Sequence, residues 1–305
     1  MTRQTLRSIM TRPGILLAAG AHDALSAKLA EESGFDCVWA SGFGLSAAAA
    51  VPDASILTPT ELLYGATTMV EATSIPVLAD CDSGFGDVNN VRRAVQKYES
   101  AGISGICIED QRFPKLNSFS AEGHTMVSTG EFSAKIHAAK DAQVDSDFFV
   151  IARTEALING LGVTEALQRA KAYVAAGADA VLIHSKARTP TEILEFASRW
   201  DGSAPLVVVP TTYSDLHVEQ LSGTHVKLVI YANQALRGAI SAMRRVLDRL
   251  IRDGTSSRIE RDIVSVEDVF TIQGMHTLEG EHTHKNGSRD SRKRASRIVT
   301  QDELR

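Results

Sequence analysis

The chain alternates between short apolar runs and longer segments in which apolar residues recur at helical spacing. The short runs are rich in β-branched residues and nearly free of charge, which is typical of parallel strands covered on both faces. We predict strands at Ile15–Ala19, Cys37–Ser41, Val77–Asp80, Gly105–Glu109, Phe148–Arg153, Ala180–Ser185, Leu206–Val209 and Lys227–Tyr231.

The segments between these strands have the spacing of amphipathic helices. We predict helices at Asp23–Ser33, Pro59–Ala72, Val88–Ala101, Glu131–Lys140, Val163–Ala176, Pro190–Trp200 and Asn233–Arg252. Three of them stop directly before Gly34, Gly102 and Gly177, and glycine is a common residue just past a helix end. Strands that alternate with helices in this way favour an α/β fold of the (β/α)8 barrel type, with an open parallel sheet as the alternative that counting leaves open.

Composition narrows the class of protein. With 305 residues and 44% hydrophobic side chains, the chain is long enough for one barrel domain, which we place at residues 1–279. A formal net charge of −5 argues against partners such as nucleic acid or an anionic membrane surface. Three cysteines in apolar runs, without a C-x-x-C pair, predict reduced thiols in a cytosolic (cytoplasmic) protein, and no window is apolar enough for a membrane span.

Two segments break the alternation of strands and helices. Residues 110–130 are polar and longer than a usual βα loop, so we expect a lid or binding loop there. Residues 280–305 are polar and partly basic, and we expect a disordered tail. A metal site at His282 and His284 is the alternative for that tail.

Acidic residues gather at the carboxyl ends of the predicted strands, where the working residues of parallel barrels lie. Asp53 follows the second strand, Asp80 and Asp82 follow the third, and Glu109 ends the fourth. Four carboxylates at one edge repel one another unless a cation lies between them. Oxygen ligands suit Mg²⁺, which keeps several waters and takes few direct protein ligands. Helix caps and loop ion pairs are the alternative explanation.

Groups suited to anions lie at the neighbouring strand ends. Arg153 ends the fifth strand, with Glu155 shortly after it, and His184 ends the sixth. The planar fork of arginine matches a phosphoryl or carboxylate group, and histidine can donate to an oxyanion. The turn that we expect at residues 41–43 is a further, weaker candidate, since its backbone N–H groups are placed to cradle an oxyanion.

One segment is highly specific. Residues 109–118 read E-D-Q-R-F-P-K-L-N-S and resemble the E-D-K-x-F-P-K-x-N-S signature of phosphoenolpyruvate mutases, in the isocitrate lyase superfamily. The resemblance extends, in one order, to W-x-S-G at residues 39–42, D-x-D-x-G-x-G at 80–86, A-R-x-E-A at 152–156 and H-S-K at 184–186. It covers roughly residues 10–275, which makes chance a poor explanation.

The resemblance implies a set of site residues for each part of the chemistry. A magnesium ion is held directly by Asp80, with Asp53, Asp82 and Glu109 acting through water. The pyruvyl part of the substrate lies against Trp39, Ser41, Gly42 and Phe43. The remaining catalytic and phosphoryl-binding residues are Asp53, Lys115, Asn117, Arg153 and His184, with Ser118 also at the substrate.

The implied reaction interconverts phosphoenolpyruvate and 3-phosphonopyruvate under a closing lid, and whether Asp53 accepts the phosphoryl group itself stays open. The resemblance also implies a homo-oligomer, a dimer or tetramer, that exchanges a C-terminal helix near Ser265–Gln273. The chain departs from the family pattern at four positions, Gln111, Phe43, Cys81 and Thr154. None of these removes an expected ligand, although Gln111 and Phe43 bear on loop closure and substrate fit.

Three alternatives remain. Phosphonopyruvate hydrolases share nearly all of these residues but tend to carry threonine where this chain has Asn117. Carbon–carbon lyases and oxaloacetate hydrolases of the superfamily resemble the chain less, because lyases use a cysteine in the loop where residues 115–119 have none. A non-catalytic barrel that binds a metabolite is the last alternative, against which the full set of expected ligands argues.

Overall fold

The computed structural model describes residues 4–120 and 125–275, so the predicted tail lies outside the described residues. The chain divides into two compact units, Met1–Ile240 and Ser241–Arg305.

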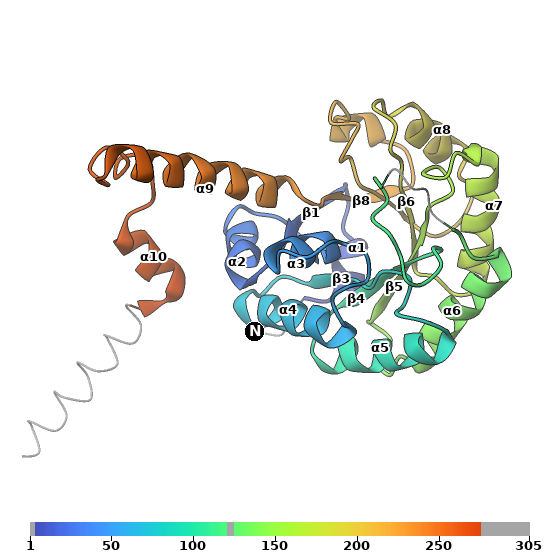
Figure 1. Ribbon diagram of the computed structural model, residues 1–305. Helices are drawn as coiled ribbons and strands as arrows, with labels where there is room; N and C mark the ends of the chain where they lie inside the picture. The colour runs from blue at the N-terminus through green and yellow to red at the C-terminus, as the bar shows by residue number, and fades with distance from the viewer. Residues whose placement is uncertain (1–3, 121–124, 276–305) are drawn as a thin grey trace, which may run out of the picture. The chain divides into compact units, whose positions relative to one another are not determined.

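In the first unit, eight parallel strands close into a barrel in chain order (Figure 1). The strands are β1 (Leu16–Ala21), β2 (Cys37–Ala40), β3 (Val77–Asp80), β4 (Gly105–Glu109), β5 (Phe149–Thr154), β6 (Ala180–Ile183), β7 (Leu206–Val208) and β8 (Val226–Tyr231). The pairing of β8 with β1 completes the ring, which confirms the predicted (β/α)8 fold. Each strand lies within two residues of its predicted ends.

Helices alternate with the strands, and Figure 1 shows α4 to α8 following one another around the sheet. They are α2 (Ala24–Glu32), α4 (Pro59–Ala72), α5 (Val88–Ser100), α6 (Thr129–Ala142), α7 (Gly162–Ala175), α8 (Thr191–Arg199) and α9 (Gln234–Asp253). The predicted helix ends at Gly34, Gly102 and Gly177 are borne out, since all three have positive φ angles of 79° to 107°.

Three short elements were not predicted: α1 (Leu6–Met10), α3 (Gly42–Ala48) and a 3-10 helix at Val218–Leu221. Each is too short to show a helical period. The segment expected to be a turn at residues 41–43 is therefore the start of helix α3, with Ser41 as its N-cap. Gly42 and Gly44 have low helix propensity, so the start of this helix was not predicted, although the alanines that follow favour a helix.

The barrel interior is filled by side chains that alternate along the strands, among them Leu16 and Ala18 of β1 and Trp39 of β2. Leu6 and Ile9 of α1 join the same cluster, and a second layer packs between sheet and helices. All three cysteines, Cys37, Cys81 and Cys107, are free and buried. Burial raises the pKa of Cys37 to about 12 and those of the other two thiols well above their usual value.

The second unit contains the rest of α9 and helix α10 (Val266–Gln273), which Ser265 and Asp268 cap. Within this unit Arg249 pairs with Asp262 and donates to the carbonyl of Arg258 at 2.6 Å.

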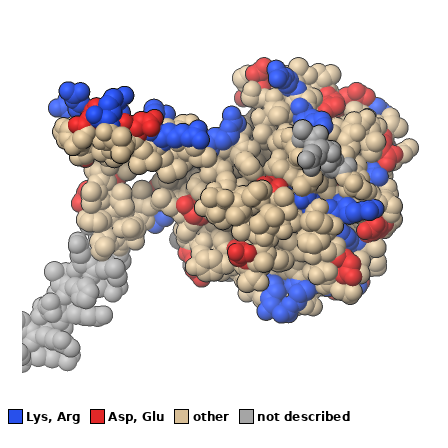
Figure 2. Space-filling view, in the orientation of Figure 1, with Lys and Arg blue, Asp and Glu red and all other residues tan. Residues whose placement is uncertain are grey.

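Basic and acidic side chains are interspersed over the face of the protein drawn in Figure 2. None of the helices in residues 4–120 and 125–275 combines the length and apolarity needed to cross a bilayer.

Candidate active site

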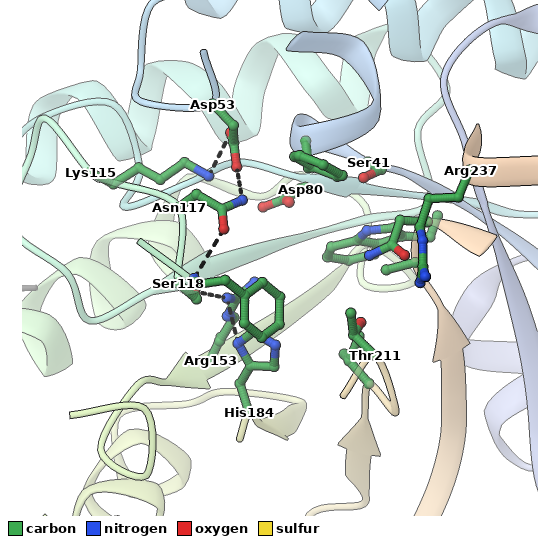
Figure 3. Close-up of a pocket in the computed structure, with 16 residues that line it drawn as sticks. Ser41, Asp53, Asp80, Lys115, Asn117, Ser118, Arg153, His184, Thr211 and Arg237 are labelled. Carbon is green, nitrogen blue, oxygen red and sulfur yellow. Dashed lines mark hydrogen bonds and ion pairs between the residues drawn. The ribbon is translucent and has the colours of Figure 1, made fainter. Parts of the chain in front are cut away.

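A cavity of about 420 Å³ opens at the carboxyl ends of the barrel strands, where the sequence predicts the site (Figure 3). Ten of the predicted residues line it: Trp39, Ser41, Phe43, Asp53, Asp80, Lys115, Asn117, Ser118, Arg153 and His184. The other three, Gly42, Asp82 and Glu109, lie directly behind that lining and contact it. Chain segments up to 145 residues apart therefore meet as expected, from Trp39 to His184.

The acidic side of the cavity is built on a turn after β3 with unusual backbone geometry. Asp82 and Phe85 have positive φ angles of 50° and 63°, a region that costs L-residues roughly 1–2 kcal/mol each. Neighbouring elements hold the turn: the backbone N–H of Glu109 donates to the Asp82 carbonyl at 2.8 Å, and the buried Lys135 ammonium of α6 donates to the Ser83 carbonyl at 2.9 Å. The turn places Asp80 in the cavity lining and Asp82 behind it, against Lys115.

We call Asp53, Asp80, Asp82 and Glu109 the acidic cluster. Lys115, from the loop after β4, inserts its ammonium 2.9 Å from Asp53 Oδ1 and 3.0 Å from Asp82 Oδ1. Burial raises the pKa of Asp82 to about 6 even though Lys115 opposes it. Burial alone lowers the pKa of Lys115, but the carboxylates of Asp82 and Glu109 outweigh it and raise that pKa well above its usual value.

Asn117 lies beside this cluster. Its Nδ2 donates to Asp53 Oδ2 at 2.7 Å, and its Oδ1 accepts from the backbone N–H of Phe119 at 3.0 Å. The amide orientation is thereby fixed, with the nitrogen toward Asp53 in Figure 3. Ser55 provides a second link, since its hydroxyl accepts from the Lys115 backbone N–H at 3.1 Å and lies 3.4 Å from Asp82 Oδ2.

The opposite side is formed by Arg153, Glu155, Ser118 and His184, which we call the arginine network. Arg153 Nε donates to Glu155 Oε1 at 2.6 Å, and Arg153 Nη2 donates to Ser118 Oγ at 2.7 Å. Ser118 Oγ donates to Glu155 Oε2 at 2.6 Å. His184 Nδ1 lies 2.8 Å from Arg153 Nη2, and the Phe119 ring packs edge-on against the imidazole at 5.4 Å.

The charges of the network are unequal. Burial by itself raises the pKa of Glu155, but its polar neighbours, the Arg153 guanidinium first among them, outweigh burial and hold the pKa well below its usual range. Glu109, which faces the same guanidinium at 3.1 Å, has its pKa raised by burial and by Glu155 despite Arg153. Burial and then Arg153 lower the pKa of His184, which favours the neutral imidazole.

The loop after β4 is anchored at both ends. Gln111 and Met126 form an antiparallel bridge, and the backbone N–H of Val127 donates to the Asp110 carbonyl at 3.0 Å. The Asp110 carboxylate accepts from the Tyr173 hydroxyl at 2.7 Å and from the Glu155 backbone N–H at 2.8 Å. The polar loop predicted at residues 110–130 is thus closed at its base, where Asp110 contacts the Glu155 backbone, and it contributes Lys115, Asn117 and Ser118 to the cavity.

The acidic cluster fits a hard divalent cation. Glu109 Oε1 is buried without a hydrogen-bond partner among the described residues, and Asp80 accepts only two long contacts of 3.3 and 3.4 Å, from the backbone N–H groups of Asp82 and Gly42. A Cβ at Gly42 would lie 3.3 Å from Asp80 Oδ2, so glycine leaves this space open. In residues 4–120 and 125–275 no three His, Cys, Asp or Glu side chains converge as direct ligands. A magnesium ion with one direct carboxylate and several waters requires no such convergence.

Sequence reasoning missed some residues of the site, one of them behind the cavity wall and three on it. Glu155 was noted at a strand end but given no role, although it is the centre of the arginine network. Thr211, Asn233 and Arg237 line the side of the cavity near the ends of β7 and β8. Their position just after predicted strands was the available signal, but no acidic residue directly beside them in the sequence marked the site.

Comparisons with known proteins agree with this geometry. A family model described as phosphoenolpyruvate phosphomutase matches residues 6–251. The chain is 46% identical over 268 residues to a phosphonopyruvate hydrolase of Variovorax sp. (strain Pal2), covering 87% of this chain and 92% of that one. It is 44% identical over 266 residues to a phosphoenolpyruvate phosphomutase of Streptomyces hygroscopicus, covering 87% and 85%.

Solved structures give the same picture. A phosphoenolpyruvate phosphomutase from Streptomyces platensis subsp. rosaceus superposes with a TM-score of 0.90 at 48% identity, covering 92% of this chain and 97% of the other. A phosphonopyruvate hydrolase in complex with oxalate and Mg²⁺ superposes with a TM-score of 0.86 at 44% identity and the same coverage. The sequence comparisons and the structural comparisons thus point to the same enzymes, and the chain belongs to the phosphoenolpyruvate phosphomutase family.

Proposed function

We propose that the chain is a magnesium-dependent phosphoenolpyruvate mutase, which interconverts phosphoenolpyruvate and 3-phosphonopyruvate and so serves phosphonate biosynthesis. The observation that carries this proposal is Asn117, whose Nδ2 is held in the cavity 2.7 Å from Asp53 Oδ2. A mutase must keep the transferred phosphoryl group in place until it is recaptured. A fixed amide donor on the cavity wall serves that purpose, because it holds a phosphoryl oxygen without attacking the phosphorus.

In the direction from phosphonopyruvate, the carbon–phosphorus bond breaks and its electron pair stays on the pyruvate enolate, whose oxygen then takes the phosphoryl group. Asp80 would hold the magnesium ion, with Asp53, Asp82 and Glu109 reached through water. When bound, the ion supplies positive charge beside the enolate oxygen. Arg153 and His184 hold the phosphoryl oxygens from the opposite side of the cavity, as donors to a group whose charge is spread over three oxygens.

The loop after β4 excludes water in this proposal. It brings Lys115, Asn117 and Ser118 over the site, and its two ends are held by the Gln111–Met126 bridge. Exclusion of water matters because a loose, metaphosphate-like phosphoryl group reacts readily with it.

Phosphonopyruvate hydrolysis to pyruvate and phosphate is a second candidate, favoured by the 46% identity to the Variovorax hydrolase. A lyase is disfavoured, since none of the three cysteines of the chain lines the cavity and all three are buried.

The deciding experiment is ³¹P NMR of the purified protein with Mg²⁺ and 3-phosphonopyruvate. We expect a phosphoenolpyruvate signal. Inorganic phosphate without phosphoenolpyruvate would replace the mutase by the hydrolase. Asn117→Thr sharpens the result: if Asn117 retains the phosphoryl group, this variant forms a larger share of inorganic phosphate than the wild type. An unchanged product ratio removes the argument from Asn117.

We also propose a homo-oligomer, a dimer or tetramer, in which the segment of α10 is exchanged between subunits. Helix α10 supports this, because Val266 and Val269 are exposed and apolar on a well-capped helix. Light scattering coupled to gel filtration tests the mass, and truncation after Val264 should lower it. A monomeric full-length chain would refute the exchange.

A further inference from the structure

Glu155 has no part in the functional assignment above, yet its carboxylate is fully buried and contacts all three other members of the arginine network. It does not line the cavity. Any effect on a substrate must therefore pass through Arg153, Ser118 or His184.

The hydrogen positions in this network follow from what each group can do. A guanidinium only donates, and an ionised carboxylate only accepts. His184 Nδ1 lies 2.8 Å from Arg153 Nη2 and 3.1 Å from Glu155 Oε1. The first neighbour requires a lone pair on Nδ1, whereas the second requires a proton there. Only one of the two hydrogen bonds can form on a neutral ring.

The rest of the network decides between them. Glu155 Oε1 already accepts from Arg153 Nε at 2.6 Å, and Oε2 accepts from Ser118 Oγ at 2.6 Å. One hydrogen of Arg153 Nη2 goes to Ser118 Oγ at 2.7 Å, which leaves the other hydrogen directed at His184 Nδ1. Arg153 Nε, Arg153 Nη2 and Ser118 Oγ then all have acceptors, provided that Nδ1 carries the lone pair. A proton on Nδ1 would instead point two hydrogens at each other across 2.8 Å.

With a lone pair on Nδ1, the proton of the neutral imidazole is on Nε2. Figure 3 shows His184 with its Nδ1 toward Arg153 and the other ring nitrogen toward the cavity. The cavity therefore receives an N–H donor, the form that can bind a phosphoryl oxygen. The other tautomer would present a lone pair and repel that oxygen.

We propose that Glu155 is a positioning residue that holds His184 in the Nε2–H tautomer, through Arg153 and Ser118, and so prepares the site for a phosphoryl group. The phosphoryl part of this inference rests on the proposed function, whereas the tautomer is a property of the free protein. Glu155→Gln tests it, because an amide offers one acceptor in place of two and turns an N–H against Arg153 Nε or Ser118 Oγ.

The first measurement is ¹⁵N NMR of the free, histidine-labelled protein, in which protonated and lone-pair ring nitrogens resonate far apart. The signal of His184 is identified by its absence from His184→Asn. We expect one Nε2–H tautomer in the wild type and a mixture of tautomers in Glu155→Gln. A wild-type ring with its proton on Nδ1, or an unchanged single Nε2–H tautomer in the variant, would overturn the proposal.

The second measurement is turnover of phosphonopyruvate. Removing a negative charge beside an anion site should on electrostatic grounds leave KM unchanged or lower it, whereas a misplaced donor lowers kcat. We expect kcat to fall by about 10- to 100-fold without a rise in KM. Glu195→Gln is the matched control, since Glu195 pairs with Arg199 at the surface at 2.7 Å, and it should retain wild-type kcat.

If Glu155→Gln fails to fold, Ser118→Ala breaks the same circuit at another point and should also mix the tautomers. A loss of thermal stability in the folded variants with kcat and tautomer unchanged would make Glu155 merely structural. If the wild type turns over no phosphonopyruvate, the proposed function fails, and the NMR result still decides the tautomer.

Discussion

The two sides of the cavity differ in how completely their polar atoms are paired. In the arginine network Arg153 Nε, Arg153 Nη2 and Ser118 Oγ each meet an acceptor within 2.8 Å. In the acidic cluster Glu109 Oε1 is buried without a hydrogen-bond partner among the described residues, and Asp80 accepts only two long contacts.

This difference separates two ways of building a site. In the network, protein acceptors hold the Arg153 guanidinium and the His184 ring in fixed orientations, so neither group needs to reorient when charge develops on a phosphoryl group. The acidic cluster is incomplete by itself, and unpaired buried oxygens are costly unless a ligand satisfies them. This difference fits the proposed function, in which the arginine network holds an anion and the acidic cluster holds a cation.

The largest expected effect comes from removing the Asp80 carboxylate, the proposed direct ligand of the magnesium ion. Asp80→Ala should lower kcat for phosphonopyruvate by about 1,000-fold or more, because the cation loses its direct carboxylate. The ³¹P NMR assay measures this, and thermal unfolding checks that the variant folds. Asp201→Ala, at an exposed aspartate paired with Lys171, is the control and should keep full activity. Normal turnover by Asp80→Ala would contradict the role of the acidic cluster.

Next in size is the loss of the cation that the chain itself supplies. Lys115→Met removes the cation that pairs with the buried carboxylates of Asp53 and Asp82. Without added metal the free energy of unfolding should therefore fall by about 3–5 kcal/mol. Urea denaturation in the presence of a chelator measures this. Lys171→Met breaks an exposed pair and should cost less than about 1 kcal/mol. Equal stability losses in the two variants would mean that the acidic cluster is not strained by its own charge.

A smaller effect is expected beneath the turn after β3. Lys135→Met removes the charged donor to the Ser83 carbonyl, and the free energy of unfolding should fall by about 1–3 kcal/mol. The same change should weaken Mg²⁺ binding, measured by titration calorimetry, because the turn that presents Asp82 loses its support. Unaltered affinity would show that the turn holds its shape without Lys135.

The smallest effect concerns pH and tests the arginine network. The pKa of His184 is lowered in the fold below its ordinary 6.5, so the unfolded chain binds more protons there than the native one. Stability should therefore fall as pH decreases from 6.5 toward the lowered pKa, by about 1.4 kcal/mol for each pH unit between the two values. Burial and Arg153 cause this shift, while Glu155 opposes it.

The comparison with His184→Asn isolates this contribution. Asp82, whose pKa is raised to about 6, acts in the opposite sense, since the native state binds its proton first and gains stability as pH falls from 6. That contribution is common to both proteins and cancels in the difference. Urea denaturation at pH 7.5 and 5 should show a larger loss for the wild type than for His184→Asn. Parallel pH curves would mean that the imidazole is as easily protonated in the fold as outside it.

The sequence allowed much of this architecture to be predicted, for physical reasons that vary by element. Strands such as Val77–Asp80 are apolar on both faces, and helices such as Pro59–Ala72 carry a capping box, so period and end signals agree. Helix α3 escaped prediction because it has only seven residues and two glycines in its first turn.

The sequence predicted which residues form the site better than it predicted the contacts between their side chains. The acidic residues lie at strand ends, and a parallel barrel brings those ends together. Nothing in the sequence indicates that Lys115 would point between Asp53 and Asp82, or that Glu155 would join Arg153 to Ser118. Those contacts depend on side-chain directions and loop paths, which no local period encodes.

The three buried cysteines can report on opening of the barrel, because their thiols become accessible only when the structure around them opens. A thiol reacts as the thiolate and only where a reagent can reach it, and in the native fold neither condition is met at Cys37, Cys81 or Cys107. Cys81 lies between Asp80 and Asp82, and its backbone N–H donates to the Cys107 carbonyl at 2.9 Å. Modification at Cys81 therefore counts the molecules in which β3 has separated from β4. The rate at which a thiol reagent modifies Cys81 under native conditions would therefore measure how often the strands beneath the active site separate.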